Sequence, residues 1–182
     1  MALTACAPTA APTPSPVPTV PQCTPLDGGA PYACTQSEHD TLAEQHALYD
    51  EAEQVLRRYR AELDRQEADW RLREMTPEFE ATTTGAYRDF VEQFIEADRN
   101  DEASRIGEPA PIVWVKPLIG ASRDGSVAAL QFCSDASTTE YVTKENPSPF
   151  VGGTVKRTYY FVPTDGSHLK IAASDAEEVD AC

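Results

Sequence analysis

The chain has 182 residues, of which 30 are acidic and 15 are basic, so its formal net charge at pH 7 is −15. This length is typical of one domain that buries its own hydrophobic core, accompanied by a tail. Such an acidic chain is not expected to bind nucleic acid or anionic lipid head groups electrostatically, because both need a cationic surface. We therefore expect no nucleic-acid partner.

The first residues resemble a bacterial lipobox, in which Leu3, Thr4 and Ala5 precede Cys6, the position that becomes acylated. A secretory signal also needs a basic region and an apolar region of about 7–15 residues before its cleavage site, and that length does not precede Cys6 here. We expect Cys6 to carry a lipid anchor at the outer face of the cell membrane. A chance match is the alternative. Diacylation would supply two chains, which is enough for stable attachment.

The other cysteines indicate an oxidising, extracytoplasmic compartment. Once Cys6 is assigned to lipidation, four of the five cysteines remain. A cysteine as the last residue suits a bridge that anchors a terminus. Four cysteines allow three connectivities, and locality favours Cys23 with Cys34 and Cys133 with Cys182; free buried thiols are the alternative. No Cys-x-x-Cys or Cys/His ligand spacing occurs, so we expect no metal.

The stretch at 7–22, "APTAAPTPSPVPTVPQ", is rich in Pro, Thr and Ala and has no periodic apolar face. Such a composition buries too little surface to offset chain entropy, and its prolines favour extended geometry. We assign 1–36 to a lipobox remnant, a disordered tether and a small disulfide loop. Residues 37–182 form the folded domain. O-glycosylation of the tether threonines stays open.

Charge and helical periodicity begin together after the tether. The spacing predicts an amphipathic helix from Ser37 to about Trp70, with Ser37 as its N-cap and Asp40 three residues later. Its apolar face consists of Leu42, Tyr49, Ala52, Leu56, Tyr59 and Leu63. A helix of this length exceeds most globular helices, so we expect a bend or break near 64–69.

A second helical region begins at Pro77 and continues to 97–101, and Gly85 inside it weakens its continuity. Its apolar stripe consists of Phe79, Tyr87, Phe90, Val91, Phe94 and Ile95. After Gly107 the pattern is that of strands. Residues 111–122 and 126–135 flank a turn at 123–125, residues 154–163 and 168–174 flank a turn at 164–167, and 138–144 form a shorter strand. Helices followed by antiparallel strands predict an α+β fold, with the helices on one face of a curved sheet.

Several segments in this order resemble secreted actinobacterial lipoproteins whose domain is similar to the nuclear transport factor two and polyketide-cyclase superfamily of α+β cones. They are "EAEQVLRRYRAELDR" at 51–65, the helical stretch at 77–100, the hairpins at 111–137 and 156–174, and the terminal cysteine. The resemblance covers 51–182 and implies a sheet that cups a cavity, dimerisation through the sheet, and the Cys133 to Cys182 bridge. In that family a Trp usually follows the last turn, where this chain has Ser167, His168 and Leu169.

Enzymes of that superfamily move protons with an Asp, His or Tyr that faces into the cone, where burial raises the pKa of a carboxylate. Asp135 is the catalytic candidate here. It lies at a strand end before Ser137 and Thr138, where an Asp more often accepts hydrogen bonds from turn amides. We interpret it as structural and keep the catalytic role as the weaker hypothesis.

Four aromatic residues are candidates for lining a cavity, although aromatic residues at such positions usually belong to the core: Tyr87, Trp114, Tyr141 and Tyr159. His39 and His46 are seven residues apart on a helix, about 10 Å, which is too far for one metal ion. His168 lies next to a turn and is expected to be exposed. No nucleophile elbow, phosphate-binding glycine loop or dinucleotide fingerprint occurs, so no cofactor is expected.

We expect a lipid-anchored, non-catalytic binding or interaction module at a bacterial cell surface, whose partner is a small apolar ligand or a surface protein. The first alternative is an isomerase, cyclase or dehydratase that uses a carboxylate or tyrosine in the cavity. The second is a prophage-encoded surface lipoprotein that blocks infection. An enclosed pocket with an inward carboxylate would favour the enzyme, and a filled cone with an exposed apolar patch would favour the interaction module.

Overall fold

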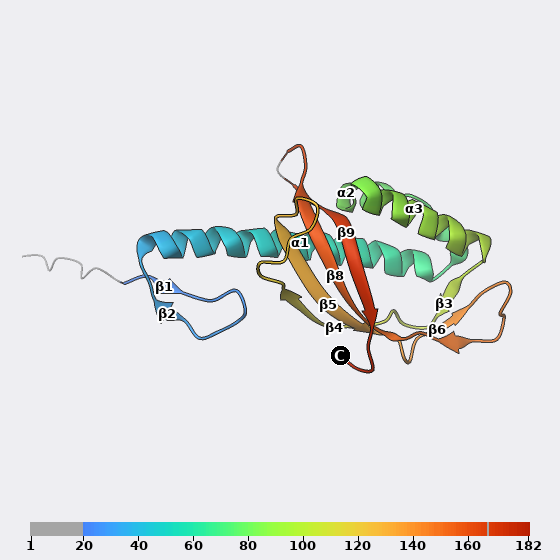
Figure 1. The fold of residues 1–182 in the computed structure, drawn as a ribbon. Coiled ribbons are helices and arrows are strands. Elements are labelled where there is room, and N and C mark those ends of the chain that lie inside the picture. Colours follow the sequence, from blue (N-terminus) through green and yellow to red (C-terminus); the bar gives the residue numbers. More distant parts are fainter. Residues whose placement is uncertain (1–19, 167) are drawn as a thin grey trace, which may run out of the picture.

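The computed structural model describes residues 20–166 and 168–182, so the lipobox with Cys6 and residues 7–19 of the tether lie outside the described residues. The fold is α+β, as the sequence predicts: helices pack against antiparallel sheets (Figure 1). Its largest sheet contains four antiparallel strands in the spatial order β4 (Ile112–Pro117), β5 (Ala128–Asp135), β8 (Thr154–Pro163) and β9 (Leu169–Glu178).

Both hairpins expected in this sheet are present; β8 has the expected limits, and the limits of the other three strands differ. Between β4 and β5 the amide of Ser126 donates to the carbonyl of Arg123 at 2.9 Å. The two central residues of this turn, Asp124 and Gly125, have φ values of 52° and 79°. Positive φ at both central positions matches the twist of a hairpin, and Asp-Gly tolerates it. The strands end well before this turn, so 118–127 is a longer connection than expected.

A second, three-stranded sheet contains β3 (Ser104–Ile106), β6 (Glu140–Val142) and β7 (Phe150–Val151). The short strand expected at 138–144 is therefore real but shorter. It pairs with β3 and β7, two segments that the strand assignment from sequence did not include.

The long first helix, α1 (Gln36–Glu67), is continuous over 32 residues and ends inside the stretch where a break was expected. A 3₁₀ helix, η1 (Trp70–Leu72), follows it. The prediction that Ser37 is the N-cap of α1 is wrong. The cap is Thr35, whose hydroxyl accepts from the amide of Glu38, while the carboxylate of Glu38 accepts from the amide of Thr35 at 2.8 Å. This reciprocal pair satisfies two amides at the helix start, which is why the helix begins earlier.

The second helical region is two helices, α2 (Pro77–Thr82) and α3 (Gly85–Asn100). Between them Thr83 forms a bridge with Ile171 of β9, and the amide of Thr84 donates to the carbonyl of Ile171 at 2.9 Å. Gly85 then has φ 56°, a conformation that glycine adopts readily. The contact with the sheet and the glycine together interrupt the helix.

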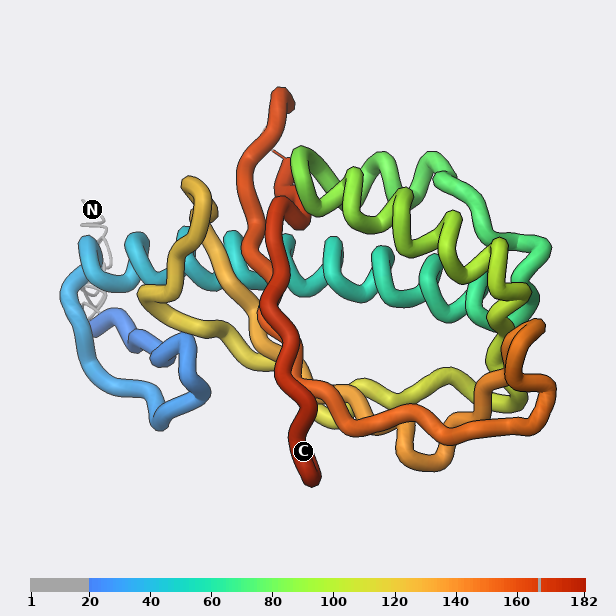
Figure 2. The backbone as a smooth tube through the Cα atoms, turned by 45° about the vertical axis from the view of Figure 1, so that its right-hand side comes forward, coloured from blue at the N-terminus to red at the C-terminus, as the bar shows by residue number. Residues whose placement is uncertain are grey.

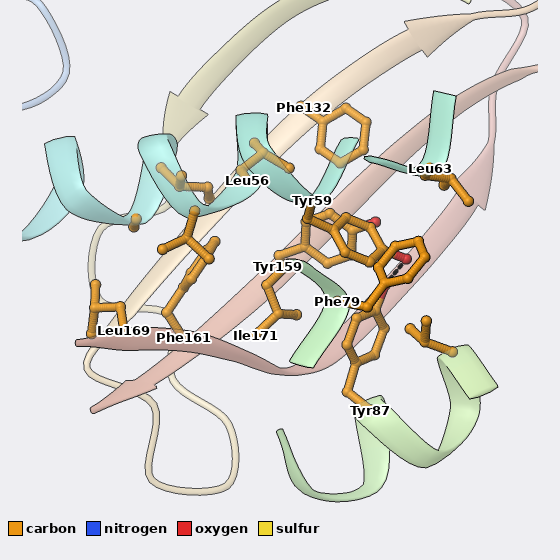
Figure 3. Close-up of a cluster of buried hydrophobic side chains, with 14 of the residues drawn as sticks. Leu56, Tyr59, Leu63, Phe79, Tyr87, Phe132, Tyr159, Phe161, Leu169 and Ile171 are labelled. Atoms are coloured by element: carbon orange, nitrogen blue, oxygen red, sulfur yellow. Dashed lines mark hydrogen bonds between the residues drawn. The ribbon is translucent and has the colours of Figure 1, made fainter. Parts of the chain in front are cut away.

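The helices pack on one face of the four-stranded sheet, here called the inner face, and bury a core rich in aromatic residues (Figure 3). The rings of Tyr59 and Tyr159 lie 5.7 Å apart, edge to face, and Phe79 lies 5.6 Å from Tyr59. The N-terminal part of α1 extends beyond the sheet, and the first buried residue of this helix is Ala52 (Figures 1 and 2). A small hairpin, β1 (Gln22–Cys23) and β2 (Tyr32–Ala33), lies beside that extension.

Both expected disulfides are present, Cys23–Cys34 and Cys133–Cys182. The first closes the small hairpin, and the second ties the C-terminus to β5. Bridges of this kind persist in oxidising compartments and indicate a secreted or extracellular protein. None of the described helices has both the length and the apolar character needed to cross a lipid bilayer.

Candidate functional site

A cleft of about 390 Å³ lies at the end of the inner face where β5 ends and β8 begins. We name it the mouth cleft. The C-terminal parts of α1 and α3, the inner face of β5 and β8, and the small sheet contribute its walls. Its principal lining residues are Arg60, Glu67, Arg73, Phe94, Asp98, Phe132, Tyr141, Phe150 and Arg157.

Buried charged side chains form one wall of the mouth cleft. The side chain of Arg73 is 3% exposed, and its Nη2 lies 2.9 Å from Oδ2 of Asp98. Arg60 donates from Nη2 to Oδ1 of Asp64 at 3.0 Å. Behind them Arg105 approaches Glu67 no closer than 3.8 Å, which is an ion pair but too long for a hydrogen bond. The wall therefore contains charges that are only partly paired.

Several buried polar atoms of this wall have no hydrogen-bond partner among the described residues. They are Nε of Arg60, Nε and Nη1 of Arg73, Nε of Arg105, and Oε2 of Glu67. A buried polar atom left unpaired costs about 1–3 kcal/mol, so native proteins satisfy such atoms with protein, water or ligand. Arg60, Glu67 and Arg73 line the cleft directly, so their side chains are the charged part of its lining.

Burial raises the pKa values of two carboxyl groups in this wall. Burial raises the pKa of Glu67 above its ordinary value, and the nearby charge of Arg60 only partly opposes this. Burial likewise raises the pKa of Asp98, although Arg73 opposes the shift. The pKa of Tyr141 is also raised, mainly by burial. A carboxyl of raised pKa in a cleft is a candidate for proton exchange with a bound molecule.

The opposite wall is aromatic. Tyr141 of β6 and Phe150 of β7 are register partners whose rings lie 6.1 Å apart. The guanidinium carbon of Arg73 lies 6.0 Å from the ring centre of Phe94. The cleft thus presents an apolar surface opposite a small number of buried polar groups, the arrangement typical of small-molecule sites.

Asp135, the catalytic candidate from sequence, lies outside the lining of the mouth cleft. Its Oδ1 accepts from the amide of Ser137 at 2.9 Å and from the hydroxyl of Thr154 at 3.2 Å. The bonds to Ser137 hold its pKa below the ordinary value. Asp135 therefore stays ionised and caps a turn, which is the structural role preferred from the sequence.

Of the four aromatic candidates, Tyr141 lines the mouth cleft. Tyr87 and Tyr159 lie in the core, where Tyr87 donates a hydrogen bond to the hydroxyl of Tyr59 at 3.1 Å. Trp114 lies on the opposite, outer face of the sheet. It is the register partner of Cys133, and its Nε1 donates to the carbonyl of Cys182 at 3.0 Å.

The histidines do not form a site. His46 binds the carbonyl of Thr24 at 2.8 Å and so attaches the small hairpin to α1, and His39 lies beside Asp40. His168 is exposed, as expected, and lies 3.7 Å from Glu51. Within 20–166 and 168–182, no group of three or more potential ligands could hold a metal ion.

A larger hollow of about 930 Å³ lies between α1 and the hairpin of β8 and β9, lined by residues that include Glu51, Arg58 and Lys170. None of the unpaired buried atoms found in the described part of the chain belongs to its lining. The larger hollow is therefore interpreted as a solvated groove. The mouth cleft is the better candidate for a functional site.

Sequence reasoning did not identify Arg60, Glu67 or Arg73. A signal for one of them exists: the apolar stripe that contains Leu56 and Leu63 continues, four residues later, at Glu67. A charged residue at a core-facing position of a helix marks either the helix end or a polar site. No such signal marks Arg73, which lies in the irregular segment between η1 and α2.

Comparisons with known proteins assign no family, since no family model matches the chain and no curated protein is significantly similar to it.

Proposed function

We propose that the protein is a lipid-anchored, extracytoplasmic binding module that takes a small molecule in the mouth cleft without transforming it. One observation carries the proposal. Arg73, whose side chain is almost fully buried and not fully hydrogen-bonded, lines the cleft together with aromatic side chains. A bound molecule would lie against this charged group and cover the rings. Anchoring through Cys6 fits the oxidising compartment that the two disulfides indicate.

Membership of the nuclear transport factor two and polyketide-cyclase superfamily is part of the proposal. Helices on the inner face of an antiparallel sheet, with a cleft at one end, support it. The alternative of an isomerase-like enzyme has one observation in its favour: the raised pKa of the Glu67 carboxyl, which lines the cleft. Such a group could take a proton from a bound carbon acid and return it.

A matched pair of variants in one strand tests the binding site. Phe150 lines the mouth cleft, and its neighbour Val151 is 57% exposed and does not line it. We expect a screen of small amphipathic compounds by NMR to shift amides of the cleft. Phe150→Ala should weaken binding about tenfold, as expected for loss of a partly buried aromatic contact. Val151→Ala should leave it unchanged. A screen without any cleft binder would reject the proposal.

The same bound compounds distinguish binding from catalysis. In D₂O, an enzyme of the isomerase kind would exchange carbon-bound hydrogens of its ligand with solvent, and Glu67→Gln would stop the exchange. A binding module would leave all carbon-bound hydrogens in place.

Intact mass of the protein secreted from its natural upstream start tests the anchor, since a diacylated Cys6 is expected. Sedimentation of the full chain tests dimerisation through the outer face of the sheet.

A further inference from the structure

The inner face of the main sheet is not fully covered beside the mouth cleft. Between α3 and β9 lies a second hollow of about 440 Å³, lined by residues that include Tyr87, Phe90, Arg157, Ala173 and Ala176. Arg157 belongs to the lining of both hollows. The linings of the two hollows therefore have this arginine in common.

Arg157 is a cation without a protein partner among the residues that the structure describes. Its register partners are Phe132 on β5 and Ala176 on β9, neither of which has a charge. In the described part of the chain its side chain makes no ion pair and no hydrogen bond. Arg99 likewise makes no ion pair among the described residues, but it lines neither hollow, so the unpaired arginine that lines these hollows is Arg157. Arg123, which lines the second hollow with it, is paired with Asp175 at 2.5 Å.

The charges around Arg157 leave room for an anion. Asp98 is engaged by Arg73, and Asp64 by Arg60. Arg60 and Arg73 add further positive charge to the lining of the same cleft. Glu67 and Asp101 also line it, Asp124 lines the second hollow, and burial raises the pKa of Glu67. A guanidinium group binds a carboxylate through two parallel hydrogen bonds, which a neutral or cationic head group cannot reproduce.

The aromatic rings next to Arg157 provide the second half of a binding site. Phe90 and Phe94 of α3 are 51% and 37% exposed, and their rings stack with centroids 6.4 Å apart. Phe90 lines the second hollow and Phe94 lines the mouth cleft. The small side chains of Ala173 and Ala176 also line the second hollow. An apolar body that covers these rings gains hydrophobic free energy roughly in proportion to the area buried.

We propose that the ligand of this surface is a small monocarboxylate with an aromatic or aliphatic body, whose carboxylate pairs with Arg157 and whose body lies on Phe90 and Phe94. This inference rests on the proposed function and specifies its ligand. The carboxylate replaces the partner that Arg157 lacks within the protein, and the body covers the two exposed rings.

Three probes test whether the site prefers an anionic head group: 4-phenylbutyrate, 4-phenylbutyramide and 4-phenylbutylamine. They share an apolar body and differ in the head group. Each is titrated into the full chain by calorimetry and NMR. The carboxylate should bind most tightly. Arg157→Gln should weaken it about tenfold or more, because hydrogen bonds to charged groups contribute on that scale. The matched control is Arg99→Gln, an α3 arginine that lines neither hollow. Because Arg157 has no partner to lose, its variant is expected to fold, which circular dichroism checks.

Phe90→Ala should weaken binding of 4-phenylbutyrate by a similar factor without changing the preference for the carboxylate head. If the amide or the amine binds as tightly as the acid, or if Arg157→Gln binds the acid as wild type does, the inference is wrong and the proposed binding function stands. If none of the three probes binds, the inference is also wrong. The proposed function itself is then decided by the wider screen with the Phe150 and Val151 variants.

Discussion

Arg73 and Asp98 form an ion pair across the base of the mouth cleft, with 2.9 Å between Nη2 and Oδ2, although the arginine side chain is only 3% exposed. The pKa of Asp98 is nevertheless raised, because the effect of burial exceeds the attraction of Arg73. A pair with these properties contributes little net stability, and losing one member leaves the other charge buried. The pair is therefore better explained by a role in the cleft than by a role in folding.

This pair predicts how the free energy of unfolding changes when both of its members are replaced together. Asp98→Asn should lower the free energy of unfolding by about 3 kcal/mol, since the guanidinium of Arg73 then lacks its counter-ion. Arg73→Met combined with Asp98→Leu should return to within about 1 kcal/mol of wild type. Urea denaturation measures both. Glu53→Gln, which breaks an exposed pair with Arg57, is the control and should cost less than about 1 kcal/mol. A double variant as unstable as the single one would contradict this account.

The hydroxyl groups of Tyr59 and Tyr87 form a second buried polar pair, and removing both should again cost less than removing one. Tyr87→Phe removes the donor of the 3.1 Å bond and leaves the hydroxyl of Tyr59 buried with one partner fewer. We expect a loss of about 1–2 kcal/mol, and a smaller loss when Tyr59→Phe is added, because both polar groups are then absent. Thermal denaturation of Tyr87→Phe and of the double variant decides this. Burial raises the pKa of Tyr87 well above 10, so alkaline titration should leave it protonated until the protein unfolds.

Glu67 predicts a dependence of stability on pH. Its pKa is raised in the folded state, so the folded protein binds this proton more tightly than the unfolded chain does. That contribution is fully present below the unfolded value of about 4.3 and is lost as the pH rises through the folded value. The charged and titratable groups around it are Arg60, Asp64, Arg73, Arg105 and Tyr141, of which Asp64 shifts in the same direction.

Glu67→Gln removes this titration. We therefore expect the variant to gain stability relative to wild type between pH 4 and pH 7, measured by urea denaturation at each pH. Glu44→Gln, at an exposed position near the start of α1, is the matched control and should show a constant difference. A difference for Glu67→Gln that does not change with pH would show that its carboxyl titrates normally.

The two disulfides should differ in their effect on the stability of the fold. Replacing Cys133 and Cys182 by serine frees a loop with a sequence separation of 49 and should cost about 4 kcal/mol. It also releases the carbonyl that Trp114 binds, so a change in tryptophan fluorescence is expected at the same time. Replacing Cys23 and Cys34 affects a hairpin beside the extension of α1, away from the core. The global unfolding midpoint should therefore change less.

The cap of α1 can be tested in the same segment. Thr35→Ala should destabilise the first turns by about 1 kcal/mol, because the amide of Glu38 loses its acceptor. Ser37→Ala should have little effect. Hydrogen exchange of the amides near the helix start is the suitable measurement, since this part of α1 lies outside the core and can open locally. Faster exchange in Ser37→Ala than in Thr35→Ala would contradict the assignment of the cap.

Much of the fold could be predicted from local features of the sequence. Spacing of apolar residues located α1 and the helical region that contains α3, turn residues located the two hairpins, and locality paired the four cysteines correctly. The N-cap was misplaced by two residues because Ser37 and Thr35 are both good caps, and only the reciprocal bonds with Glu38 distinguish them. The break between α2 and α3 depends on a bridge from Thr83 to Ile171, 88 residues away in sequence, which no local pattern encodes.

For the candidate site, too, the sequence and the tertiary structure determine different things. The sequence by itself determined an acidic, disulfide-bonded α+β protein, because helical periodicity, turn chemistry and cysteine spacing act over short distances. Only the tertiary structure decided where the polar site lies. Arg73 comes from an irregular segment, Glu67 from the end of α1, and Arg157 from the middle of β8. Each looks like an ordinary surface charge in the sequence, because burial and the lack of a partner depend on which elements pack around the side chain.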